Sequence, residues 1–472
     1  MEKLKYDISR YLCAAAEISP KFRSKVFEQI LHNTVRYVAP SYGVDVPLVV
    51  KHCLRGHTRD FIVDALISVA VLWTFIGTFK SHGIFSGIPY FVYSLVSFPL
   101  LLAFLLKWLN LYVGFRVVVK DLKNDQHNMN GKKSFMESQY EQRLQQLEKL
   151  QEGNIAYYSG YSPFVGAGVR LGGWSFVCGT AKRGITKSEH VVISLPDLYR
   201  HINKSMNSLH IPHLSIKDMI YVDGKSIRND SRFLSNPYEA PSTHVADFLI
   251  DEYKVKQEEN VRYYQTVQVL GWQGNFVFSS FFRISKNDQH LFVEANYYLL
   301  PPLESVYYEI DRLHSSIPVG ILVKMALSSI IPAIISLPTA PLRAVRSGSA
   351  FFASWKEKKE TKKQIDEDQR FDYGAYESLR EMAATNKLQN FFQQSDVDMY
   401  RKQIERCFTD SIMEFLESQG VDISEFVQRK ETVINQGIMV NGGSFTAENV
   451  SVGNQAQMLI HQAKNVVQNS SV

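Results

Sequence analysis

The residues best suited to chemistry lie in a glycine-rich segment, residues 160–175, which contains Gly166, Gly168 and Arg170. Backbone N–H groups of glycine-rich loops bind phosphates, and a nearby arginine can contact an anion. The known phosphate-binding fingerprints require a helix directly after the loop, whereas residues 174–176 (WSF) are typical of a strand. Two interpretations therefore stay open: a structural loop with glycines at positive φ, and a loop that binds an anionic ligand.

A second polar group follows at His210, His213, Asp218 and Asp223. Imidazoles and carboxylates supply acid–base groups and metal ligands. The same stretch is also typical of a loop that leads into a strand. We include His213 and Asp218 among the candidate ligand-binding residues.

The sequence predicts no metal site and no cofactor. His52, Cys53 and His57 are potential ligands, but no fourth partner has the spacing of a known site. The four cysteines are too far apart for a zinc ribbon and exclude a disulfide-built scaffold. The sequence contains none of the signature motifs of hydrolases, kinases or P-loop proteins, so it assigns no catalytic residue.

Two apolar runs of similar length, residues 61–79 and 88–106, approach the length that crosses the roughly 30 Å hydrocarbon core. A pair of buried core helices is the alternative. Lysines and arginines flank the outer ends of the runs, whereas the short connection between them carries only Lys80. We therefore predict a transmembrane hairpin in the inner membrane of the cell, with both termini cytoplasmic.

Asp64 is the only carboxylate within these two runs. Ionisable groups inside a membrane are often functional, which makes Asp64 a candidate membrane-functional residue. It lies near the start of its run, at the expected depth of the lipid headgroups. A solvated interfacial aspartate is therefore the alternative.

A third apolar stretch, residues 317–337, contains prolines and Lys324. As a span it would place the following basic residues outside the cell, against the positive-inside rule. We therefore predict a membrane-surface or re-entrant segment over 313–345; a buried segment and a true span are the alternatives. The charged residues of 346–370 predict a solvated linker, or else a basic contact with anionic lipid headgroups.

The fold class that these patterns predict is an α+β membrane protein with a mainly antiparallel cytoplasmic sheet. Alternation and turn residues predict strands at 155–158, 173–178, 190–195, 262–270, 275–285 and 290–300, with a helix near 195–209. The predicted segments are a helical region at 1–60, the membrane hairpin at 61–113, a linker and amphipathic helix at 114–152, the β-rich domain at 153–312, the segments at 313–345 and 346–370 just described, a C-terminal helical unit at 371–433, and a β-hairpin with a frayed tail at 434–472.

Several motifs resemble an uncharacterised family of bacterial, especially actinobacterial, membrane proteins. They are residues 158–168 (YSGYSPFVGAG), 173–176 (GWSF), 213–224, 291–302 and 434–445. This resemblance implies an N-terminal membrane hairpin and a large cytoplasmic part. It implies no activity, cofactor or catalytic residue.

Together these observations predict a membrane-anchored cytoplasmic interaction or sensory protein without catalysis. Its expected partners are the lipid bilayer and, through the C-terminal region, further copies of the chain; the sequence names no protein partner. A net charge of +5 over 472 residues is too small a bias to predict nucleic-acid binding. The alternative is an enzyme or ligand-gated effector that binds an anionic small molecule at residues 160–175, and a pore formed by an oligomer comes third.

Overall fold

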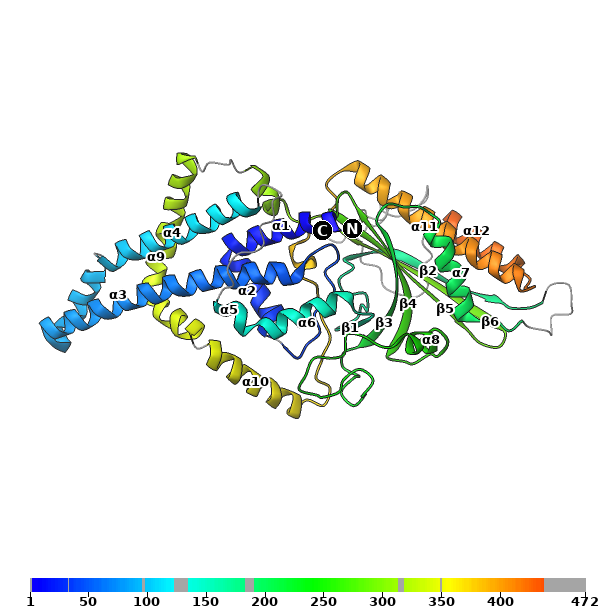
Figure 1. The fold of residues 1–472 in the computed structure, drawn as a ribbon, viewed down its shortest axis with the longest axis horizontal. Coiled ribbons are helices and arrows are strands. Elements are labelled where there is room, and N and C mark those ends of the chain that lie inside the picture. Colours follow the sequence, from blue (N-terminus) through cyan, green and yellow to red (C-terminus); the bar gives the residue numbers. More distant parts are fainter. Residues whose placement is uncertain are drawn as a thin grey trace, which may run out of the picture. The chain divides into compact units, whose positions relative to one another are not determined.

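The computed structural model describes residues 2–32, 34–95, 98–122, 135–182, 191–312, 318–348 and 350–436. It is a mixed α+β structure with a six-stranded sheet (Figure 1). Internal contacts divide the chain into two units that interleave along the sequence. The helix unit comprises residues 1–153, 224–243 and 303–383, and the sheet unit comprises residues 154–223, 244–302 and 384–472.

The helix unit contains the apolar runs. Its helices and helical turns are α1 (Glu2–Ile18), α2 (Pro20–Val26), η1 (Phe27–His32), α3 (Val46–Leu95), α4 (Phe98–Val117), η2 (Val118–Leu122), α5 (Phe135–Gln139), α6 (Glu141–Glu152), η3 (Ser305–Arg312), α9 (Val319–Gly348), α10 (Ala350–Glu367) and η4 (Glu381–Ala383). The amphipathic helix predicted before residue 152 is present as α5 and α6, with Leu144, Leu147 and Leu150 buried. Helix α3 begins at Val46, well before its apolar run. It therefore continues from the predicted N-terminal region into the predicted membrane segment.

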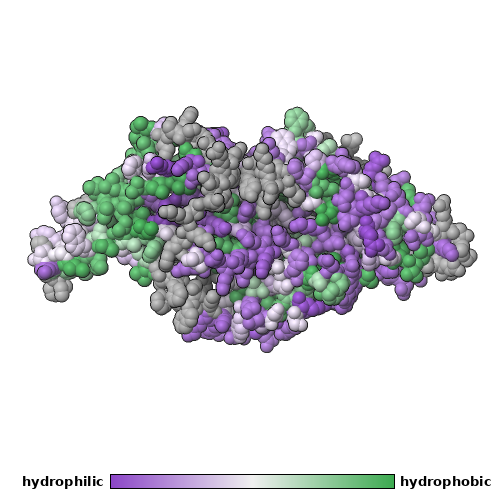
Figure 2. Space-filling model, in the orientation of Figure 1, coloured by the Kyte–Doolittle hydropathy of each residue, from purple (hydrophilic) through white to green (hydrophobic). Residues whose placement is uncertain are grey.

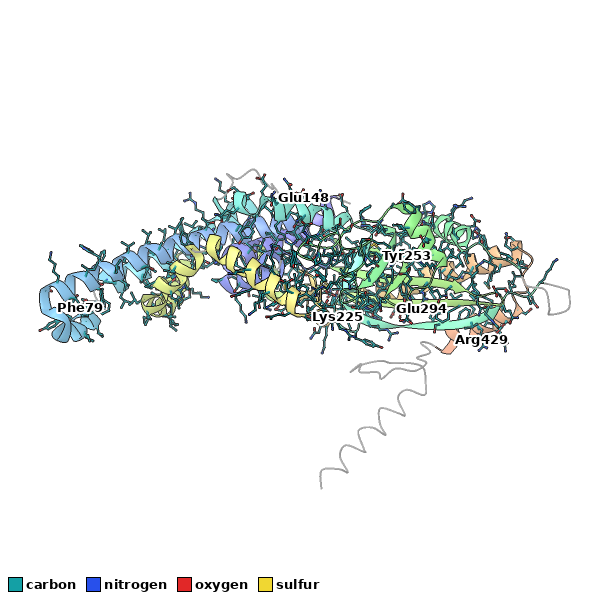
Figure 3. All side chains as sticks on the ribbon, turned by 90° about the horizontal axis from the view of Figure 1, so that it is seen from below. Phe79, Glu148, Lys225, Tyr253, Glu294 and Arg429 are labelled. Atoms are coloured by element: carbon teal, nitrogen blue, oxygen red, sulfur yellow. The ribbon has the colours of Figure 1, made fainter. Side chains whose placement is uncertain are left out.

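Helix α3 folds back on itself. Phe75 and Phe91 are 16 residues apart, which corresponds to about 24 Å in a straight helix, yet their ring centroids are 5.3 Å apart. The hydroxyls of Thr78 and Ser94 approach to 3.5 Å. Figure 3 shows Phe79 at the tip of this reversal. Helical structure thus continues through the short connection between the two predicted runs, and the reversal occurs inside α3.

Helix α9 runs across the pair formed by α3 and α4 (Figure 1). The contact is a small apolar core of Val63 and Ile67 from α3, Ala103 from α4, and Ala333, Leu337 and Ala340 from α9. Among the residues that the structure describes, three stretches are long and apolar enough to cross a membrane: Val46–Ser81, Phe98–Leu122 and Val319–Val345. These apolar helices suggest a membrane protein.

The sheet unit has the strand order β1-β3-β4-β5-β6-β2. Its strands are β1 (Ile155–Tyr158), β2 (Val169–Gly179), β3 (Leu214–Asp223), β4 (Val261–Gly271), β5 (Phe276–Lys286) and β6 (His290–Leu300). The β4–β5–β6 meander confirms the predicted strands at 262–270, 275–285 and 290–300. All neighbouring strands pair antiparallel except β1 and β3, which pair parallel.

The two faces of the sheet are covered differently. The described part of this unit contains the helices α7 (Leu195–Asn207), α8 (Asp247–Val255), α11 (Phe391–Ser418) and α12 (Ser424–Gln436). Phe408 of α11 stacks on Phe282 with ring centroids 3.9 Å apart, which defines the helix-covered face. On the opposite face, Phe164 stacks on Phe281 at 4.0 Å. Because successive side chains of a strand point to opposite faces, we call this second side the loop-covered face.

One predicted strand is wrong. Residues 191–194 form no strand, and α7 begins at Leu195. Pro196 explains the difference, because proline removes a hydrogen-bond donor from a β-ladder but is favoured in the first turn of a helix. Helix α11 is followed by Gly420 with φ +77°, a conformation that favours glycine at a helix C-terminus. The predicted β-hairpin and tail lie outside the described residues from residue 437 onwards.

Candidate functional site

Asp64 joins the three apolar helices of the helix unit. Its carboxylate accepts hydrogen bonds from Lys107 Nζ of α4 at 2.7 Å and from Arg343 of α9, through Nε at 2.8 Å and Nη2 at 3.1 Å. The Asp64 side chain is 9% exposed, whereas that of Arg343 is 41% exposed. We call these three residues the ionic node. The sequence singled out Asp64 but treated its two partners only as flanking charges.

A second buried polar group lies further towards the start of α3. Glu17 of α1 accepts hydrogen bonds from Arg59 Nη1 at 2.5 Å, and its Oε1 lies 2.8 Å from His52 Nδ1. Burial opposes ionisation of Glu17, but the hydrogen bond to His52 and the charge of Arg59 outweigh it and hold its pKa below the usual value. One turn before Asp64, Asp60 pairs with Arg23 and accepts a hydrogen bond from Asn110 at 2.7 Å. These contacts fasten α1, α2 and α4 to α3.

Two glycines permit this close packing. A Cβ at Gly56 would lie 2.8 Å from Cδ of Arg23, and one at Gly114 would lie 3.0 Å from the carbonyl oxygen of Glu17. A larger residue at Gly56 would displace the buried arginine. The polar contacts therefore depend on small residues at helix crossings, which no sequence motif indicates.

The glycine-rich segment is a loop as far as Gly168 and a strand from Val169. Gly166 and Gly168 have φ values of +91° and +84°, which fits the predicted structural loop. A Cβ at Gly168 would lie 2.4 Å from the carbonyl oxygen of Leu299, so only glycine fits there. Arg170 lies on β2 and donates a hydrogen bond from Nη2 to Asn296 Oδ1 at 3.2 Å.

The structure does not bring the predicted ligand-binding residues into one site. His213 is exposed and has φ +58° just before β3. Asp218 of β3 accepts a hydrogen bond from Tyr263 at 2.7 Å and pairs with Lys254 at 3.0 Å. Four strand spacings, about 19 Å, separate β3 from the β2 strand of Arg170. Asp218 also lies on the helix-covered face, together with Tyr263, whereas Arg170 lies opposite Tyr298 on the loop-covered face.

A different polar group gathers on the loop-covered face, from β4, β5 and β6. Arg283 pairs with Glu294 at 3.5 Å, and Glu294 also accepts hydrogen bonds from Tyr264 Oη at 3.2 Å and Asn296 Nδ2 at 2.8 Å. Arg262 lies nearby, and within the described residues the one hydrogen bond of its side chain goes to the carbonyl oxygen of the preceding residue, at 3.1 Å. We call Arg262, Arg283, Tyr264 and Glu294 the arginine cluster; Figure 3 labels Glu294.

The electrostatics of the arginine cluster are unbalanced. Burial, followed by the charge of Arg283, lowers the pKa of Arg262 below its usual value. Burial and the charge of Glu294 raise the pKa of Tyr264, which keeps its hydroxyl protonated. The sequence missed this group because arginines on separate strands meet only through the register of the sheet.

The potential metal ligands of the sequence have other partners. His52 bonds to Glu17, while the ring of His57 packs 4.6 Å from that of Phe27. Among the residues that the structure describes, no three histidine, cysteine, aspartate or glutamate side chains are arranged to hold a metal ion.

A family model described as an AbeC-like domain matches residues 173–447, more than half of the chain. The chain belongs to the AbeC-like domain family. The AbeC-like region includes the arginine cluster and Arg343, whereas Asp64, Lys107 and the glycine-rich loop precede it. This match supports the prediction that the chain belongs to an uncharacterised family. No curated protein and no solved structure matches this AbeC-like chain significantly.

Proposed function

We propose that this AbeC-like chain is a membrane-anchored interaction or sensory protein whose sheet unit faces the cytoplasm and acts by binding rather than catalysis. The anchor is the group of apolar helices α3, α4 and α9. The observation that carries the proposal is the exposure of large apolar side chains on all three helices. In α9 this exposure is combined with buried small and polar residues, an arrangement that we call reversed polarity.

Helix α9 has this reversed polarity most clearly. Its buried positions include Ser329, Ser336, Ala333 and Ala340. Its exposed apolar residues are Val319, Val323, Leu327, Ile330, Ile331, Ile334, Ile335, Leu342 and Val345. In water this arrangement would forgo the hydrophobic stabilisation that folding requires, whereas in lipid small residues favour close helix packing.

Helices α3 and α4 present the same kind of surface. Figure 2 shows hydrophobic residues gathered over these two helices. The exposed ones include Ile62, Leu66, Val69, Leu72, Trp73, Ile76, Leu101 and Leu105. A contiguous exposed apolar surface marks an interaction site, and helices of spanning length make lipid the best-suited partner.

A membrane-surface position for α9 accounts for both its path and its faces. Lys324, Ser328, Thr339 and Arg343 recur at intervals of four or eleven residues, which places them along one side of a helix. This polar stripe lies between the packed face and the exposed apolar face. A helix that crosses the α3–α4 pair with separate packed, apolar and polar sides suits the boundary between headgroups and acyl chains.

The ionic node supports the proposed depth of the apolar helices in the membrane and the proposed orientation of the chain. Asp64 lies near the start of the first apolar run, Lys107 closes the second, and Arg343 follows the third. Because Asp64 contacts both Lys107 and Arg343, the proposal takes these three run ends to lie at one level. Together with the excess of lysine and arginine beyond them, this level is the proposed cytoplasmic boundary, with both termini on the cytoplasmic side.

Binding without catalysis is supported by the separation of the residues that the sequence proposed for a ligand site. Arg170 and Asp218 lie on opposite faces of the sheet, and His213 is exposed. Self-association through residues 434–472 is part of the proposal. Deleting residues 437–472 should then shift the detergent-purified protein to a smaller species in light scattering, and an unchanged mass would contradict this part.

Cysteine labelling tests the orientation. Lys80→Cys should react with a membrane-impermeant maleimide in intact cells, because it lies by the outer end of the hairpin. Ser418→Cys, at an exposed position at the end of α11, should react only after the cells are opened. The matched background is the Cys407→Ser chain, since the other three cysteines are buried. Labelling of Ser418→Cys in intact cells would contradict the proposed topology.

A further inference from the structure

We propose that the arginine cluster is a binding site for an oxyanion, namely the carboxylate or phosphate group of an anionic ligand. This inference deepens the proposed binding function of the sheet unit and rests on it. It gives a ligand class to side chains for which the family match names no role. It also moves the expected anion site from the glycine-rich loop to β4 and β5.

The two arginines are held close together by the sheet. Arg283 is paired across β5 and β6 with Glu294, while Arg262 is paired across β3 and β4 with Tyr221. Continuing the β4–β5 register places Tyr264 opposite Arg283 and makes Arg262 its diagonal neighbour, about 7–8 Å away between backbone positions. Two long guanidinium side chains at this separation can reach one small anion.

The charges around the two arginines leave Arg262 without a paired carboxylate among the described residues. Glu294 is already occupied by Arg283, Tyr264 and Asn296. Arg262 forms no ion pair with any described carboxylate and is half-buried beside the like charge of Arg283. Three other charged groups described by the structure lie near this face. The charge of Asp223 acts on Tyr158, as does that of Arg262. Arg170 is hydrogen-bonded to Asn296, and Lys217 is exposed.

The donor set has the chemistry of oxyanion recognition. A guanidinium presents a planar fork of N–H donors that matches carboxylate and phosphate oxygens. The hydroxyl of Tyr158 supplies a further neutral donor at the same face, and burial raises its pKa. The Tyr264 hydroxyl already donates to Glu294. An anion between Arg262 and Arg283 would relieve their repulsion, so binding and folding of this unit should be coupled.

Titration of the purified full-length chain in detergent tests the proposal. The probes are sodium phosphate and sodium succinate, measured by calorimetry in a buffer without other oxyanions. We expect saturable binding of at least one probe, a loss of at least tenfold in affinity for Arg262→Gln, and a smaller loss for Arg262→Lys, which keeps the charge without the fork. The matched control is Arg200→Gln, which removes an exposed arginine of the same unit and should leave affinity unchanged.

A second readout separates binding from a structural role. Without an anion, Arg262→Gln should unfold at the same temperature as the parent chain or at a higher one, because it removes a repulsion and no ion pair. A lower unfolding temperature, equal probe affinity in Arg262→Gln, or no saturable binding of either probe to the parent chain would overturn the proposal.

The anion can come from a soluble molecule or from a lipid headgroup, and nanodiscs distinguish these sources. Phosphate affinity that is equal in phosphatidylcholine discs and in discs with phosphatidylglycerol assigns the site to a soluble ligand, whereas weaker affinity in the anionic discs assigns it to a headgroup. Membrane sedimentation of Arg262→Gln is measured in parallel. It should stay unchanged, so failure of the anchor and failure of the anion site give different results.

Discussion

Replacing Asp64 by asparagine removes the negative charge of the ionic node while nearly preserving its volume. Lys107 and Arg343 would then face each other without a counter-charge at the edge of an apolar environment. Breaking a fully buried ion pair from one side costs about 3–5 kcal/mol. Because Arg343 is partly exposed and can turn towards water, we expect about 2–4 kcal/mol for Asp64→Asn.

The assay is unfolding of the full chain in mixed micelles, as detergent is exchanged for a denaturing one and helix content is followed. The matched control is Glu367→Gln, which breaks an exposed ion pair with Lys363 in the same unit and should cost less than about 1 kcal/mol. Replacing Asp64, Lys107 and Arg343 together by leucine should restore most of the loss, because well-packed apolar residues often substitute for a buried ionic group. Asp64→Asn with a free energy of unfolding within about 0.5 kcal/mol of the parent would refute the reasoning.

Three further predictions concern single residues, all read out from the free energy of unfolding. Glu17→Gln should destabilise the chain near pH 7. Because folding lowers the pKa of Glu17, the difference in free energy of unfolding between parent and variant should shrink as pH falls below the usual carboxyl pKa of about 4.3. A difference that grows on acidification would contradict this sign. Gly168→Ala meets backbone at 2.4 Å and should cost clearly more than Gly160→Ala, which has a positive φ but open space and should cost about 1 kcal/mol; equal costs would show that the contact is relieved. Phe408→Ala removes a fully buried ring and should cost about 3–5 kcal/mol, whereas Phe391→Ala at an 81% exposed position should stay within about 0.5 kcal/mol; comparable losses would place both rings in the core.

Local patterns in the sequence predicted much of the sheet unit. The alternation and tight turns between Val261 and Leu300 specify the three-stranded meander, and the stripe through Val397 and Phe408 specifies α11. Such elements are predictable because one strand or helix carries its own hydrophobic period. The strand expected at 190–195 failed because Pro196, a helix-start residue, outweighed a short apolar run.

The candidate sites were less predictable, because their members meet only through tertiary structure. Asp64 was evident from its position, but Arg343 lies 279 residues further along the chain. Likewise, Arg262 and Arg283 are separated by a turn, and only the register of β4 and β5 brings them to one face. Arg170, which the glycine-rich motif indicated, lies on the same face, but its guanidinium donates a hydrogen bond to the side-chain amide of Asn296.

Alkaline carbonate extraction of membranes from cells that produce the full-length chain tests the lipid anchor most directly, since high pH and salt strip proteins held only by surface charges. The exposed apolar surfaces of α3, α4 and α9 predict that the chain stays in the membrane pellet and is released only by detergent. Release into the carbonate supernatant as a monodisperse protein would contradict the anchor and, with it, the proposed membrane function.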